Sequence, residues 1–128
     1  MNRCLVIDDS QVMRKVARAI LEDLNVDVAE AEDVDVAFEY CRAGMPELIL
    51  LDIDLPSSNA VEFVRRIRNE DGGERPVIVF CTTDNDVVQI SKALQAGAND
   101  YVQKPFDREM LASKLTTAGL LKTAVRAA

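Results

Sequence analysis

Carboxylates stand directly after two apolar stretches of the sequence. Asp8 and Asp9 follow the stretch 4–7, and Asp52 follows the stretch 48–51 in LILLDID. If those stretches are neighbouring strands, the acids lie close together, and like charges at short range repel. A divalent cation that prefers oxygen ligands, above all Mg²⁺, relieves such repulsion. The pattern therefore indicates a metal site, although an isolated Asp9 could equally serve as a helix cap.

Two more residues suit phosphoryl transfer. Thr82 closes a third apolar stretch, 77–81, and offers a hydroxyl group. Lys104 follows a shorter apolar segment and could place positive charge on phosphoryl oxygens. A loop lysine is usually just solvated, but Pro105 restricts the backbone beside Lys104 to an extended or turn geometry. Together with the acids, these residues predict chemistry on a phosphoryl group.

The composition narrows the chemistry further. The 128 residues include no histidine, which excludes a histidine base, a phosphohistidine on this chain and the commonest zinc ligand. The net charge of −7 argues against direct nucleic-acid binding. No apolar run approaches the roughly 18 residues of a membrane span, and a cytoplasmic location is expected. Three cysteines in apolar contexts predict buried, reduced thiols.

The apolar stretches that precede the chemical residues have the length of strands covered on both faces, at 4–7, 48–51 and 77–81. Two weaker candidates, 26–29 and 100–102, are short or alternate with polar residues and suit edge strands.

Apolar stripes with helical spacing lie between and after the strands. Ser10 is expected to cap the first helix and Asp107 the last, while Gly44 and Gly97 follow the second and fourth. The stripes are Met13, Val16, Ala17, Ile20, Leu21 and Leu24; Val34, Ala37, Phe38 and Cys41; Phe63, Val64 and Ile67; Val87, Ile90 and Leu94; and Met110, Leu111 and Leu115. Each stripe should cover one face of a sheet.

Strict alternation of strands and helices predicts an α/β fold. We expect a flavodoxin-like, doubly wound sheet of five parallel strands in the order 2-1-3-4-5, with five helices. In that order the first and third strands are neighbours, and ligands bind at their carboxyl ends, where the predicted metal acids fall. A single domain, residues 1–128, is expected, with the last helix at about 107–126 and no output domain.

Four segments resemble the receiver domains of two-component response regulators: LVIDDS, LILLDIDLP, VIVFCTT and AGANDYVQKPF. The resemblance covers nearly the whole chain and is closest in kind to single-domain regulators of the chemotaxis type. It implies that Asp52 accepts a phosphoryl group in a phosphorelay. It also implies that Asp8 and Asp9 hold Mg²⁺ together with Asp52 and the backbone carbonyl of Asp54.

The same resemblance implies roles for the remaining chemical residues. Lys104 would pair with the acyl phosphate, following a cis peptide bond to Pro105, and Thr82 would be the switch hydroxyl that Tyr101 follows. The donor would be a histidine kinase or a histidine phosphotransfer protein. Such a protein is not an enzyme beyond its own phosphorylation and dephosphorylation.

Without an output domain, signalling would pass through a protein target. The expected docking face consists of the fourth helix, fifth strand and fifth helix, with Lys92, Gln95, Gln103 and Arg108 as candidate contacts. The chain could alternatively be a shuttle that passes the phosphoryl group on to a phosphotransfer protein.

Three residues depart from the family pattern. Asp54 is acidic at a variable position, and Thr83 is larger than the usual alanine or glycine, so both could crowd the acyl phosphate. Thr83 could equally turn into solvent. Ala60 replaces a common glycine, and would cost of order 1 kcal/mol if its φ had to be positive.

Two other functions fit parts of the pattern. LILLDIDLP also looks like the Asp-x-Asp motif of haloacid dehalogenase-type phosphatases, but in those enzymes the remaining metal acids follow the lysine, whereas here Asp8 and Asp9 come first. A receiver-like binding module that has lost phosphorylation would not need the full set of phosphoryl ligands.

Overall fold

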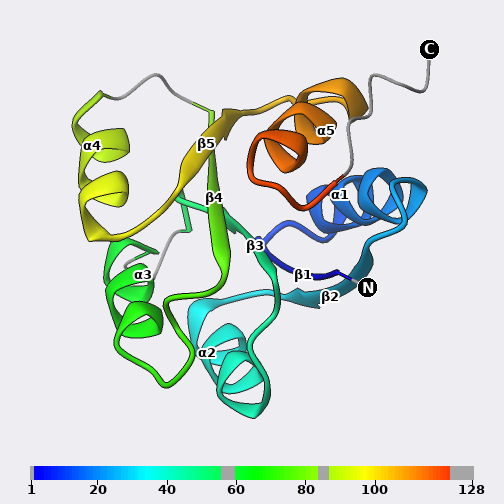
Figure 1. Ribbon diagram of the computed structural model, residues 1–128. Coiled ribbons are helices and arrows are strands. Elements are labelled where there is room, and N and C mark those ends of the chain that lie inside the picture. The colour runs from blue at the N-terminus through cyan, green and yellow to red at the C-terminus, as the bar shows by residue number, and fades with distance from the viewer. Residues whose placement is uncertain (1, 56–59, 84–86, 122–128) are drawn as a thin grey trace.

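The computed structural model describes residues 2–55, 60–83 and 87–121, in which strands and helices alternate (Figure 1). The strands are β1 (Arg3–Ile7), β2 (Asp27–Ala31), β3 (Leu48–Asp52), β4 (Val77–Thr82) and β5 (Asp100–Gln103). The helices are α1 (Gln11–Asp23), α2 (Val34–Ala43), α3 (Ala60–Arg68), α4 (Val87–Ala96) and α5 (Arg108–Thr117). The predicted element order is confirmed.

Within the described residues, five strands form one parallel sheet in the order β2-β1-β3-β4-β5, as predicted. Because β1 and β3 are neighbours, with Ile7 opposite Leu51, the residues that follow them emerge at the same edge of the sheet. The outer strands β2 and β5 are only partly buried, which agrees with their polar residues.

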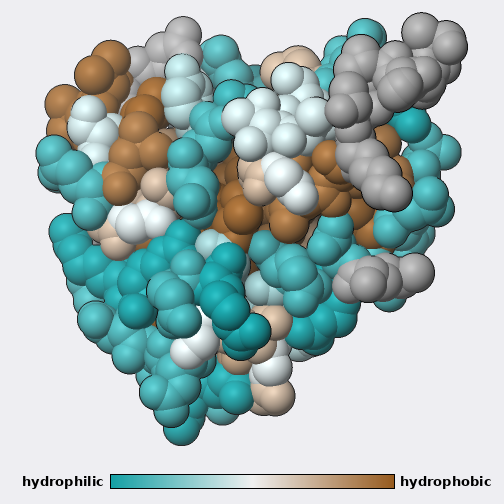
Figure 2. Space-filling view, in the orientation of Figure 1, coloured by the Kyte–Doolittle hydropathy of each residue, from teal (hydrophilic) through white to brown (hydrophobic). Residues whose placement is uncertain are grey.

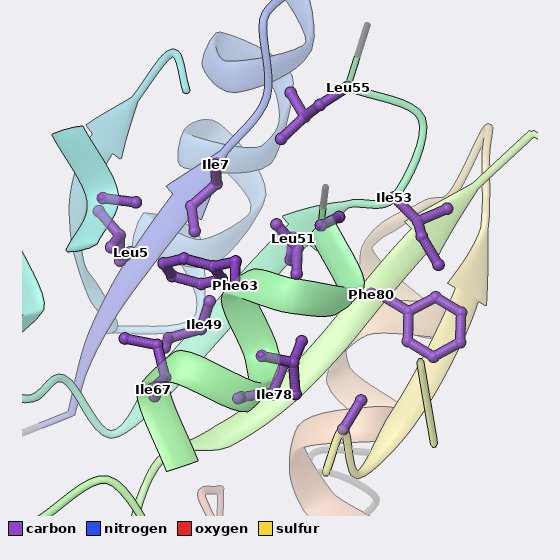
Figure 3. Packing of buried hydrophobic residues seen from close by; sticks show 14 of the residues in the cluster. Leu5, Ile7, Ile49, Leu51, Ile53, Leu55, Phe63, Ile67, Ile78 and Phe80 are labelled. Atoms are coloured by element: carbon purple, nitrogen blue, oxygen red, sulfur yellow. The ribbon is translucent and has the colours of Figure 1, made fainter. Parts of the chain in front are cut away.

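Helices cover both faces of the sheet, with α2, α3 and α4 on one side and α1 and α5 on the other (Figure 1). Because successive side chains of a strand point to opposite faces, Leu5 and Ile7 join one buried cluster while Cys4 and Val6 join the other. Phe63 of α3 lies over the sheet near Ile7 and is 1% exposed (Figure 3). This packing fixes the strand ends that carry the chemical residues.

The buried face of α4 differs from the predicted stripe. Val87 is 72% exposed and Leu94 is 40% exposed, whereas Ala93 is buried and Ile90 is half-buried. The helix therefore presents its Ile90, Ala93 and Ala96 side to the core. The prediction is confirmed for Ile90 and wrong for Val87 and Leu94. Small alanine side chains let a helix lie close to its neighbours, so the larger residues are displaced to the rim.

Two single residues in the predicted stripes are also exposed: Val16 of α1 and Met110 of α5, at 41% and 38%. Each lies at the margin of a stripe whose central residues are buried, such as Ala17 and Leu111. An apolar stripe is wider than the contact it makes, and its edge faces water.

The last helix is shorter than predicted. It ends at Thr117, and Gly119 has a φ of +80°. The Gly119 amide donates to the Thr116 carbonyl at 3.0 Å and the Leu120 amide to the Leu115 carbonyl at 2.9 Å, the hydrogen-bond pair of a glycine-terminated helix. The predicted helix to about residue 126 was wrong for residues 118–121, and 122–128 lie outside the described residues.

The predicted caps of α1 and α5 are present. The Ser10 hydroxyl accepts from the Met13 amide at 3.2 Å, and the Asp107 carboxylate accepts from the Met110 amide at 2.9 Å. No helix in residues 2–55, 60–83 or 87–121 is both long and apolar enough to cross a bilayer.

Candidate functional site

Three carboxylates meet where β1 and β3 end. Each of Asp8, Asp9 and Asp52 offers an oxygen, and these oxygens all lie within 4.8 Å of one another. Asp8 and Asp52 are buried, at 5% and 4% exposure, while Asp9 is exposed. The fold thus brings together the acids that were predicted to converge.

Lys104 reaches this cluster from the loop after β5. Its Nζ lies 2.9 Å from Asp8 Oδ2 and 3.4 Å from Asp52 Oδ1, and its side chain is 11% exposed. The Lys104 amide donates to the Thr82 carbonyl at 2.9 Å, and a cis peptide bond joins Lys104 to Pro105. The lysine is therefore a site residue and not a solvated loop charge.

Burial and charge act in opposite directions on the pKa values of this site. Burial raises the pKa of Asp52, and the neighbouring charge of Asp8 adds to the increase, although the Asp54 amide and Lys104 oppose it. Burial alone would lower the pKa of Lys104, but its hydrogen bond to Asp8 and the carboxylate charges outweigh that effect, so its pKa is raised. An ionised Asp52 in this position is held at a cost in free energy.

The oxygen-rich donor set fits a hard cation. Carboxylate oxygens are the ligands that Mg²⁺ takes in proteins, and the set contains no thiolate or imidazole that would favour a softer metal. A dication among three acids would also offset both the burial and the Asp8 charge that raise the pKa of Asp52. The residues present therefore fit Mg²⁺.

Asp54 and Thr83 lie together at the edge of the site. The Asp54 amide donates to Asp52 Oδ1 at 2.9 Å, which orients the Asp52 carboxylate. The Asp54 carboxylate accepts from the Thr83 amide at 3.3 Å and lies 3.4 Å from the Thr83 hydroxyl. Thr83 is exposed, which agrees with the prediction that it turns into solvent. It also contacts Asp54 and so links the end of β3 to the end of β4.

Thr82 and Tyr101 occupy adjoining strands. Thr82 ends β4 and is 3% exposed, and Tyr101 of β5 is 36% exposed. The Tyr101 ring stacks on Phe80 with centroids 5.8 Å apart, and Lys114 Nζ lies 5.4 Å from the Tyr101 ring centre. Their predicted switching roles are movements and stay predictions.

Two smaller expectations can be compared with the structure. Ala60 begins α3, and among the described residues Asn25 is the only non-glycine with positive φ, so the backbone cost considered for Ala60 does not arise. Cys4, Cys41 and Cys81 are all buried and free, as predicted. Burial raises the pKa of each thiol, to about 11 for Cys41, which disfavours the reactive thiolate.

Arg14, a residue that no predicted motif includes, contacts the acidic loop from α1. Its Nη1 donates to the Asp8 carbonyl at 2.7 Å. The available signal was a basic residue in the first turn of the helix that follows the acids, where the helix dipole disfavours positive charge.

The chain belongs to the response regulator receiver domain family, whose family model matches residues 4–116. Members of this family are signalling modules and not enzymes that turn over an external substrate. The match sets aside the dehalogenase-type phosphatase, in agreement with the position of Asp8 and Asp9 directly after the first strand.

Similar proteins include regulators of two lengths. The chain is 33% identical over 125 residues to the transcriptional regulatory protein DltR of Streptococcus agalactiae, covering 98% of this chain and 55% of DltR. It is 33% identical over 115 residues to the chemotaxis protein CheY1 of Helicobacter pylori, covering 88% of this chain and 93% of CheY1. The chain thus spans about half the length of DltR and nearly all of CheY1.

A solved relative contains the predicted metal. The receiver domain of the sensor histidine kinase PA1611 of Pseudomonas aeruginosa is 30% identical, with a TM-score of 0.83 over 91% of this chain and 95% of that domain. Its structure has a magnesium ion coordinated in the active site cleft. The acidic cluster of the present chain is consistent with such a site.

Proposed function

We propose that this chain accepts a phosphoryl group on Asp52 from a phosphohistidine of a histidine kinase or histidine phosphotransfer protein. The observation that carries the proposal is the meeting of Asp8, Asp9 and Asp52 within 4.8 Å, with Lys104 Nζ 2.9 Å from Asp8 and 3.4 Å from Asp52. Family membership supports the choice of donor.

In the proposed step, an Asp52 carboxylate oxygen attacks phosphorus in line with the phosphorus–nitrogen bond of the donor. The oxygen–phosphorus bond forms, the phosphorus–nitrogen bond breaks, and its electron pair returns to the imidazole. Asp52 Oδ1 accepts a hydrogen bond from the Asp54 amide, which leaves Asp52 Oδ2 as the attacking oxygen. Lys104 then moves its charge from the carboxylates to the phosphoryl oxygens.

Asp8, Asp9 and Asp52 would hold Mg²⁺ with the backbone carbonyl of Asp54. The ion would neutralise charge on the phosphoryl oxygens. Burial raises the pKa of Asp52, whereas a nucleophilic carboxylate must be deprotonated. Lys104, the Asp54 amide and the ion would therefore be needed to keep Asp52 ionised.

We place the signalling output on the α4-β5-α5 face. Apolar side chains are exposed there, including Leu94 at 40%, Tyr101 at 36% and Met110 at 38%. Figure 2 shows hydrophobic surface over α4. Inward movement of Thr82 on phosphorylation, followed by Tyr101, would change this face and shift the population toward a target-binding form.

Four polar residues are the candidate contacts that we expect on that face. Lys92, Gln95, Gln103 and Arg108 are all exposed. Arg108 also forms an ion pair with α1, in which its Nε lies 2.6 Å from Asp23 Oδ2. A target that uses Arg108 would have to compete with this ion pair.

Phosphotransfer profiling tests the proposal. The protein is incubated with each labelled histidine kinase and phosphotransfer protein of its organism, beside the variants Asp52→Asn and Asp54→Asn. Transfer to the wild type and to Asp54→Asn, with none to Asp52→Asn, is expected. Label on the Asp52→Asn variant would show that another residue accepts the phosphoryl group.

A stand-alone role in signalling is part of the same proposal, by analogy with the length of CheY1. An immunoblot of a cell extract would give the size of the native protein, and a larger band than the present chain would contradict it. A pull-down with and without beryllofluoride would separate a terminal regulator, with a phosphorylation-dependent target, from a shuttle to a phosphotransfer protein.

A further inference from the structure

Arg14 of α1 contacts the peptide that joins the two metal acids of the first strand end. Its Nη1 donates to the Asp8 carbonyl at 2.7 Å, and its Nε donates to Glu30 Oε1 at 3.0 Å. The side chain is 15% exposed. One guanidinium therefore joins the β1–α1 loop to β2 and can hold both partners in a fixed geometry.

Glu30 is itself held by a second arginine. Arg18 Nε lies 2.6 Å from Glu30 Oε2, and Arg18 Nη1 lies 2.9 Å from Glu22 Oε2. The hydrogen bonds of Arg18 and Arg14 lower the pKa of Glu30, so it stays ionised and Arg14 keeps its partner. Arg18 thus supports the network without a contact to the acidic loop among the described interactions.

The position of Arg14 needs an explanation, because a positive charge in the first turn of a helix opposes the helix dipole. Asp8 is fixed through its side chain, since Oδ1 accepts the Ser10 amide at 2.9 Å and Oδ2 accepts Lys104 Nζ at 2.9 Å. The exposed Asp9 follows directly, and Arg14 holds the carbonyl of the peptide from which Asp9 extends.

We propose that Arg14 is a positioning residue for the magnesium site, which it serves by fixing the Asp8–Asp9 peptide so that the Asp9 carboxylate faces Asp52. This inference rests on the proposed function. Groups that orient metal ligands without touching the metal change metal affinity by about 10- to 100-fold when they are removed.

The charge of Arg14 and its proposed positioning role have opposite effects on Mg²⁺ affinity, so the direction of the change on mutation distinguishes them. As a nearby positive charge, Arg14 repels Mg²⁺, so its removal would tighten binding if charge alone mattered. As a positioning residue, its removal loosens binding. Arg18→Gln provides the matched control. It removes a positive charge from the same helix and an ion pair with the same Glu30, but it leaves the contact between Arg14 and Asp8 in place.

The test is a titration of the full chain with MgCl₂, followed through the amide signals of Asp9 and Asp54 in nitrogen–proton NMR spectra. Wild type, Arg14→Gln, Arg14→Lys and Arg18→Gln are compared, and unchanged spectra elsewhere show that each variant is folded. Arg14→Gln is expected to bind Mg²⁺ about tenfold more weakly than the wild type. Arg18→Gln should bind it equally or more tightly.

Arg14→Lys separates charge from geometry if Arg14→Gln fails to fold. Lysine keeps the charge but lacks the planar fork that reaches both partners, so weaker binding than wild type is expected. Unchanged or tighter binding by both Arg14 variants would overturn the positioning role while leaving the proposed function intact. Failure of the wild type itself to bind Mg²⁺ at these signals would instead contradict the proposed function.

Discussion

Replacing Asp52 with asparagine should stabilise the fold when Mg²⁺ is absent. Asp52 is 4% exposed, and its pKa is raised by burial and by Asp8, so its ionised form costs free energy in the native state. Asparagine has nearly the same volume and keeps an oxygen for the Asp54 amide. Lys104 is not left unpaired, because Asp8 lies 2.9 Å away.

The expected change in the free energy of unfolding follows from the raised pKa of Asp52. Each unit by which a native-state pKa is raised corresponds to about 1.4 kcal/mol. The raised pKa of Asp52 already includes the favourable charge of Lys104, 3.4 Å away, so the cost of ionisation remains after that ion pair is counted. We expect Asp52→Asn to raise the free energy of unfolding at pH 7 by about 1 to 2 kcal/mol.

The gain should depend on pH in a defined direction. Because the pKa of Asp52 is higher in the native than in the unfolded state, the native state binds more protons, and wild-type stability falls as pH rises through this interval. The cost is fully present above the raised native pKa and disappears below about pH 4, the ordinary range for aspartate. The advantage of Asp52→Asn should therefore shrink as pH falls from 7 toward 4.

Urea unfolding in EDTA, at several pH values, measures these differences directly. Asp54→Asn is the control, since Asp54 is exposed and the change should stay within about 0.5 kcal/mol. Added MgCl₂ should favour the wild type, by about 2.7 kcal/mol at a concentration 100 times Kd. A less stable Asp52→Asn in EDTA at pH 7 would refute the electrostatic account of the site.

Three further predictions concern other parts of the chain. Arg68→Met should lower the free energy of unfolding by about 2 to 4 kcal/mol, because the Arg68 guanidinium donates to backbone carbonyls of Gly73, Pro76 and Gly97, all of which would lose a charged donor. Urea unfolding checks this, and a loss no greater than that of the exposed Arg65→Met would contradict it. Thr83→Ala, which removes the hydroxyl beside Asp54, should speed phosphorylation by acetyl phosphate; an equal or lower rate would show that Thr83 does not crowd the site. Gly119→Ala should cost about 1 kcal/mol in the same unfolding assay, since the φ of +80° disfavours a side chain although no atom lies within 4 Å of the added Cβ. An unchanged stability would imply that α5 continues through this residue.

The sheet order and the acidic cluster could be predicted because each depends on strong, local signals. Apolar stretches bounded by acids, proline or threonine indicated β1, β3 and β4, and the topology of alternating elements then placed Asp8 beside Asp52. The caps of α1 and α5 were equally readable, since Ser10 and Asp107 act through the adjacent turn.

Other features depend on contacts that periodicity does not encode. The rotation of α4 follows from close packing through Ala93, and the end of α5 follows from the left-handed Gly119, a glycine that the pattern allowed inside a longer helix. The Arg68 hydrogen bond to Gly97 and the Arg14 hydrogen bond to Glu30 join elements that are 29 and 16 residues apart, so neither follows from apolar periodicity.

The most direct test of the central claim is to locate the phosphoryl group itself. The protein is phosphorylated with a cognate donor in MgCl₂, reduced with borohydride, which converts an aspartyl phosphate to homoserine, and analysed by peptide mass spectrometry. Homoserine at position 52, and its absence when EDTA replaces MgCl₂, is the predicted result. Homoserine at Asp9 or Asp54 instead, or equal conversion without the metal, would contradict the account.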